Sequence, residues 1–265
     1  MTMLASLLRH ERAVVLAALA AVVALAWVYL LLGAGITMDE MDMGGGQIML
    51  MSPPWTPGYA LLVFLMWSIM MLAMMLPGAA PTILLVTTLG RQRGVGGARS
   101  AGLFSLGYLL AWIGFSAAAT ALQWWLDRTE ILSGELALGS GLLAGGVLVA
   151  AGIYQCLPLK HACLRHCRSP LAFLLHHWRP GGWAALDNGL RHGVFCLGCC
   201  WMLMAMLFVG GLMNLLWIAA IALLIFFEKA LPWGGRMSRV TGLVLIGWGM
   251  VMGAAAVWPA APMPG

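Results

Sequence analysis

Uncharged apolar stretches recur along the 265-residue chain, separated by short segments that carry charge, glycine or proline. A helix that crosses the hydrocarbon of a bilayer needs roughly 20 mostly apolar residues. The pattern predicts seven transmembrane helices, over residues 13–33, 59–89, 101–124, 136–156, 193–209, 213–231 and 240–258. We divide the fifth span from the sixth at Gly210-Gly211, because the apolar stretch 193–231 is too long for one crossing. The predicted fold is an all-α, polytopic membrane helix bundle that forms one domain over residues 1–265.

Two features refine this pattern. The first span is expected to be a retained anchor, because its apolar run is longer than that of a signal peptide and lacks a suitable small-residue cleavage site. Pro77 and Pro81 lie inside the second span and are expected to break or kink that helix about midway.

Composition supports membrane residence. Hydrophobic residues make up 62% of the chain and charged residues only 9%, against roughly a quarter in a soluble domain. A soluble enzyme and a nucleic-acid-binding protein are therefore excluded, although the formal net charge is +5. The expected surroundings are a lipid bilayer, and no nucleic-acid partner is expected.

The basic residues set the predicted orientation. Of the 14 Lys and Arg residues, 13 fall in alternating segments that share one side of the predicted membrane, and only Arg128 falls on the other. By the positive-inside rule the N-terminus is cytoplasmic and the C-terminus is periplasmic. Residues 157–192 then form the one long cytoplasmic loop. Adjacent to it, Glu228 and Lys229 are expected to form an interfacial ion pair or to hold this loop.

Candidate metal ligands crowd this loop and the start of the fifth span, where all six cysteines lie between Cys156 and Cys200. Thiols stay reduced in the cytoplasm, so metal ligation is favoured over disulfide formation. On a helix, His192, Cys196 and Cys200 form a stripe with Cys199 beside it. The candidate thiol and imidazole ligands are Cys156, His161, Cys163, His166, Cys167, His192, Cys196, Cys199 and Cys200.

Methionines supply a second candidate set. Met66, Met70 and Met74 form one stripe on the second span, and the predicted outer loop carries Met38, Met41 and Met43 among acidic residues. Thioethers are soft ligands that favour Cu(I), whereas thiolate and imidazole also suit Zn²⁺ or an iron–sulfur centre. Copper is therefore the expected metal, with zinc as the alternative. Packing in the helix bundle is the competing explanation for the buried methionines.

Three motifs resemble a known family: MWSIMMLAMMLP at 66–77, YQCLPLKHACLRHCRSP at 154–170 and CLGCCWMLM at 196–204, followed by Glu228-Lys229. They resemble the bacterial family of predicted metal-binding integral membrane proteins, called domain of unknown function 2182. The resemblance covers most of the chain from the second to the sixth span. It implies a multi-pass protein of the bacterial inner membrane with a metal site, and it implies no reaction.

Two function classes follow. The first is a copper-handling membrane protein that acts in transport, in delivery to a small periplasmic or membrane partner protein, or in assembly of a copper enzyme. The second is an integral metal-binding subunit of a membrane-bound redox enzyme. No nucleophile–base set and no phosphate-binding loop occurs in the sequence, so we identify no catalytic residues. The absence of paired histidines inside the spans favours the first class.

Overall fold

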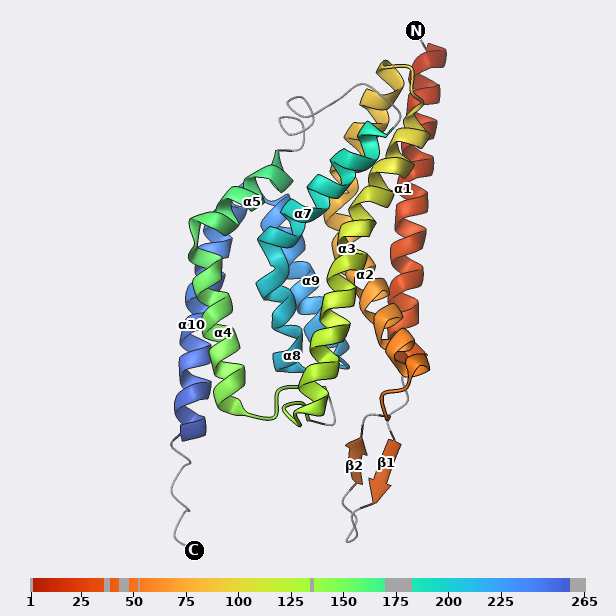
Figure 1. Cartoon of the computed structure of the whole chain (residues 1–265). Helices are drawn as coiled ribbons and strands as arrows, with labels where there is room; N and C mark the ends of the chain where they lie inside the picture. The colour runs from red at the N-terminus through yellow and green to blue at the C-terminus, as the bar shows by residue number, and fades with distance from the viewer. Residues whose placement is uncertain are drawn as a thin grey trace, which may run out of the picture. The chain divides into compact units, whose positions relative to one another are not determined.

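Helices form where the apolar stretches occur, as hydropathy predicts. The computed structural model describes residues 2–35, 39–42, 48–51, 53–133, 136–169 and 183–257, which are almost entirely helical (Figure 1). The elements are α1 (Thr2–Leu31), η1 (Gly33–Gly35), β1 (Asp39–Asp42), β2 (Ile48–Met51), α2 (Pro57–Gln92), α3 (Gly97–Arg128), α4 (Gly141–Cys156), α5 (Pro158–Arg168), α7 (Ala184–Ala205), α8 (Leu207–Gly210), α9 (Leu215–Ala230) and α10 (Gly234–Val257).

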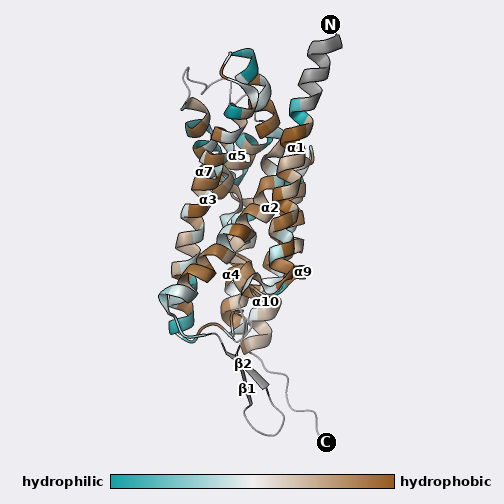
Figure 2. Cartoon of the chain, turned by 90° about the vertical axis from the view of Figure 1, so that its right-hand side faces the viewer, coloured by the Kyte–Doolittle hydropathy of each residue, from teal (hydrophilic) through white to brown (hydrophobic). Residues whose placement is uncertain are grey.

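Several of these helices have the length and apolarity of membrane spans. Among the described residues, five helices are long and apolar enough to cross a bilayer, and α4 with α5 would add a sixth if that pair, bent by 64°, is one span. Helix α9 is shorter, with 16 residues. Apolar residues cover most of α2, α3 and α10, and hydrophilic residues gather toward the helix ends (Figure 2). The helices are thus compatible with membrane insertion, and the number of seven spans stays a prediction.

Local chemistry explains most helix ends. Helix α4 stops because Leu157 precedes Pro158 and is extended (φ −68°, ψ 144°), and Pro158 then begins α5. The predicted break at Gly210-Gly211 is confirmed, since Gly211 has a φ of 86° and the side chain of Asn214 caps the start of α9. One helix runs through both prolines of α2, so the expected break does not occur, and the alternative of a kink at Pro77 and Pro81 stays a prediction.

Two predicted boundaries also need correction. Residues 136–140 are not helical, because Leu138 N–H donates to Phe208 O and Gly139 N–H donates to Ile131 O, so the fourth helix begins at Gly141. The predicted loop at 157–192 is helical at both of its ends, which are α5 and the first turns of α7. His192 therefore lies inside a helix.

Outside the helices, β1 and β2 form an antiparallel hairpin in which Met41 lies opposite Met49 and Asp39 lies opposite Met51. Apart from this short hairpin, the regular structure of the described residues is all helical, as predicted. Of the predicted outer methionines, Met41 belongs to β1, whereas Met38 and Met43 fall outside the described residues.

The chain divides into two compact units, which we describe separately. The first comprises Met1–Ala34, Val63–Thr120 and Ala162–Cys199. In it, α1 contacts α2 through an ion pair between Glu11 and Arg91 (3.1 Å) and a hydrogen bond from Arg12 to Thr88. Helices α3 and α7 approach closely at Gly107 and Gly189, where an added Cβ atom would clash with the backbone of the other helix.

The second unit comprises Gly35–Leu62, Ala121–His161 and Cys200–Gly265. Its main helix pair is α4 with α10, which lie side by side (Figure 1). Two glycine pairs permit this contact: a Cβ atom at Gly145 would lie 2.6 Å from Gly249 O, and one at Gly152 would lie 2.5 Å from Gly242 O. Small residues at such positions let helix backbones pack closely.

Candidate metal centre

Cysteines on α5 and α7 come together in the first unit. A Cβ atom added at Gly198 would lie 2.9 Å from Cys163 Sγ, so the two helices meet where α7 has no side chain. The thiols of Cys196 and Cys199 lie near enough to Cys167 to affect its pKa. We call Cys163, Cys167, Cys196 and Cys199 the thiol cluster. From the sequence we expect a site of Cys196, Cys199 and Cys200 completed by Cys163, Cys167 or His192, and that full set of ligands stays a prediction.

The two α5 thiols of the cluster hold their protons more firmly than free cysteine does. Hydrogen bonding to Cys196 and Cys199 raises the pKa of Cys167 well above its usual value, and burial adds to the effect. Burial, followed by the charge of Cys199, raises the pKa of Cys163. A metal that binds these sulfur atoms as thiolates must therefore displace protons.

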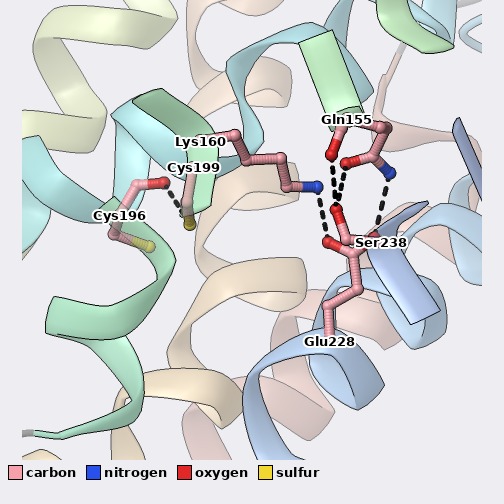
Figure 3. Close-up of polar contacts among 6 residues, drawn as sticks. All are labelled: Gln155, Lys160, Cys196, Cys199, Glu228 and Ser238. Atoms are coloured by element: carbon pink, nitrogen blue, oxygen red, sulfur yellow. Dashed lines mark hydrogen bonds and ion pairs between the residues drawn. The ribbon is translucent and has the colours of Figure 1, made fainter. Parts of the chain in front are cut away.

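Hydrogen bonds also orient the thiols of α7. Cys199 Sγ donates to the carbonyl oxygen of Cys196 at 3.1 Å (Figure 3). Cys196 Sγ lies 3.1 Å from Tyr108 Oη, and both residues are buried. Nevertheless, within the described part of the chain, no three His, Cys, Asp or Glu side chains are arranged to hold a metal ion. The thiols are neighbours that the described structure does not arrange around one ion.

The predicted histidine ligands make other contacts. The ring of His166 stacks on Phe195, with centroids 4.3 Å apart and planes at 4°, and its Nδ1 lies 2.9 Å from Ala162 O. The ring of His192 packs against Phe104 and Tyr108. In the second unit, His161 lies beside Gly235 on α10.

The other two cysteines differ from each other. Cys156 is exposed at the end of α4 and neighbours Gly242 of α10. Cys200 is buried and follows Cys199 in α7. Both were predicted as ligands from the sequence, and that role stays a prediction for each of them.

The methionines of the second predicted span face protein. Met66, Met70 and Met74 are buried, with at most 3% of each residue exposed, and so are Met71 and Met75. The stripe predicted from sequence therefore lies in the interior rather than on a lipid-facing surface. Burial is compatible with packing as well as with a copper-binding role.

A buried polar network, which the sequence did not predict, anchors the start of α5 in the second unit. Lys160 Nζ lies 2.6 Å from Glu228 Oε2, and Gln155 Nε2 donates to Glu228 Oε1 at 2.9 Å (Figure 3). Ser238 Oγ donates to Gln155 O or Oε1 at 3.0 and 3.1 Å. Glu228 thus pairs with Lys160 on the predicted loop segment, in line with the expectation that it holds this loop, whereas the identity of its partner was not predicted. The pairing of distant residues carries no local sequence signal.

Comparison with known proteins bears on the metal. The model of a family described as PpoB2, copper chaperone, matches residues 64–252. No curated protein and no solved structure matches the chain. The match agrees with the copper expected from ligand softness, whereas identity with the family of unknown function that the motifs resemble stays a prediction.

Proposed function

The chain belongs to the PpoB2 copper chaperone family, and from this membership we propose that it is a copper-handling protein of the bacterial inner membrane. In this proposal the protein takes up Cu(I), holds it at the thiol cluster and delivers it to a partner protein. Copper is its cargo, and no catalytic step is assigned to it.

The observation that carries the proposal is the meeting of thiols from α5 and α7. Thiolates are soft ligands and select Cu(I) or Zn²⁺ over hard cations. Cys167 neighbours both Cys196 and Cys199, so these three thiols are the candidates to share one ion. Family membership favours copper over zinc.

The buried methionines of α2 support transfer as well as storage. Thioethers are soft ligands, like Cu(I) itself, but they bind the ion more weakly than thiolates do. They therefore suit a path along which the ion must be released at each step. Over Met66 to Met74 the helix rises roughly 12 Å, a large part of the depth of a hydrocarbon core of about 30 Å. We place the copper path along this stripe.

The test is a paired cysteine variant. Cys167→Ser with Cys199→Ser removes one thiol from each helix. Cys156→Ser is the matched control, because in this proposal exposed Cys156 lies outside the cluster and does not bind the copper. After anaerobic purification without chelators, elemental analysis should find copper in the wild type and in the control. The paired variant should lose most of its bound copper. Unchanged copper content in that variant, or zinc in place of copper in the wild type, would contradict the proposal.

A further inference from the structure

One hydroxyl group links the methionine helix to the thiol cluster. Tyr108 Oη lies 3.2 Å from the backbone carbonyl oxygen of Met75 on α2 and 3.1 Å from Cys196 Sγ on α7. All three residues belong to the first unit and are buried. The carbonyl of Met75 and the sulfur of Cys196 are therefore no farther apart than two hydrogen-bond lengths.

This arrangement has a rigid frame. Tyr108 lies on α3, one residue after Gly107, where an added Cβ would clash with the backbone of Leu186 on α7. Gly193 makes a similar close approach, since its Cβ would lie 2.6 Å from that of Ala111. The ring of Tyr108 also packs against His192, one turn before Cys196. These close approaches hold the backbone of α3 at Tyr108 against α7.

Met75 belongs to the buried methionine set of α2. Met71 and Met75 are fully buried one turn apart, and Met74 of the predicted copper stripe directly precedes Met75. Cys196 in turn neighbours Cys167 in the thiol cluster. Tyr108 thus contacts both the backbone of the methionine helix and one thiol of the cluster.

We propose that Tyr108 is a positioning residue for transfer of Cu(I) between the methionines of α2 and Cys196, so that Cys196 is the thiol that exchanges copper with the methionine path. This inference rests on the proposed function. Tyr108 does not bind copper in it: its hydroxyl holds the Cys196 sulfur beside α2.

The step is a ligand exchange without electron transfer. The copper–thioether bond breaks and leaves the methionine unchanged, a copper–thiolate bond forms at Cys196, and the thiol proton is released to solution. Copper remains Cu(I) throughout. The role of Tyr108 is to shorten the distance that the ion must cross, which affects the rate of exchange more than the final occupancy.

The test separates loading rate from equilibrium binding. The full-length protein in detergent is mixed anaerobically with Cu(I) supplied as its acetonitrile complex, and the ultraviolet copper–thiolate absorption is followed in time. Tyr108→Phe removes only the hydroxyl and should slow loading about tenfold, the effect of a barrier increase near 1.4 kcal/mol, with an unchanged final absorbance. Tyr154→Phe is the matched control, because Tyr154 is also buried but belongs to the second unit.

A combined variant tests whether Tyr108 acts on the methionine path. Changing Met66, Met70 and Met74 to Leu should also slow loading, and adding Tyr108→Phe should slow it little further, because both changes block one route. An unchanged loading rate in Tyr108→Phe would overturn the inference. So would a loss of final absorbance as large as that of the paired cysteine variant, which would indicate a purely structural role. Absence of any copper–thiolate signal in the wild type would instead contradict the proposed function itself.

Discussion

At the scale of single residues, Lys160 and Glu228 depend on each other because both side chains are almost fully buried. A buried charge that loses its partner costs about 3–5 kcal/mol, whereas removal of both charges of a pair is often nearly neutral. Lys160→Met should therefore lower the free energy of unfolding by about 3–5 kcal/mol. Lys160→Met combined with Glu228→Gln should recover most of this loss, since the amide oxygen of the introduced glutamine can still accept a hydrogen bond from Gln155.

Thermal unfolding of the detergent-solubilised protein measures this difference. Lys229→Met is the control, because it removes a charge of the same sign from the neighbouring position without leaving Glu228 unpaired. A single variant as stable as the wild type would show that the ion pair does not stabilise the fold.

A second prediction at this scale concerns the protonation of Cys167. Because its pKa is raised in the folded protein, the stability that its bound proton contributes is present below the ordinary cysteine pKa and is lost as pH rises through the raised value. The thiolate is the reactive form. Iodoacetamide should therefore modify Cys167 of the metal-free protein slowly near neutral pH. The rate should rise only when the pH exceeds the usual pKa of cysteine.

Peptide mass spectrometry of the alkylated protein measures the rate at each cysteine. Exposed Cys156 is the internal reference and should react first near neutral pH. Equal rates at Cys156 and Cys167 at that pH would contradict the hydrogen-bonded arrangement of the cluster.

At the scale of elements, the contact between α4 and α10 depends on reciprocal glycines. Gly152→Ala would place a methyl group 2.5 Å from Gly242 O, and neither backbone can give way as a flexible side chain would. Overpacking of this kind typically costs about 1–3 kcal/mol. Gly152→Ala should lower the unfolding temperature, whereas Gly146→Ala on the same helix should not, because no atom lies within 4 Å of its added Cβ. Equal stability of the two variants would show that the helices pack differently.

At the scale of the whole molecule, the distribution of Lys and Arg predicts how the chain crosses the membrane. Alkaline phosphatase is active only outside the cytoplasm, so a fusion after Gly46 should be active and a fusion after Pro180 inactive. The same orientation keeps the thiol cluster in a reducing compartment. The opposite pair of activities would reverse the topology and would favour disulfides among the cysteines.

Much of the fold could be predicted from the sequence, because hydropathy is a local property and membrane-length helices satisfy their own backbone hydrogen bonds. The helices and the break at Gly210-Gly211 follow from it. The start of α4 could not be predicted, because residues 136–138 are apolar, whereas the pairing of Leu138 N–H with Phe208 O depends on a distant part of the chain. Helical spacing likewise predicted which cysteines and methionines share a face.

Hydropathy and residue spacing along the chain are enough to predict that the protein is helical and apolar and that its soft ligands are grouped. Which of these groups meet depends on the packing of the helices. It brought Cys167 to Cys196 and Cys199, turned the methionine stripe of α2 inward, and packed His166 and His192 against aromatic rings. It also paired Lys160 with Glu228 and put Tyr108 between Met75 and Cys196. The physical reason is that periodicity fixes the face of a helix on which a residue lies, whereas its partners depend on helix rotation and close approach, which long-range packing determines.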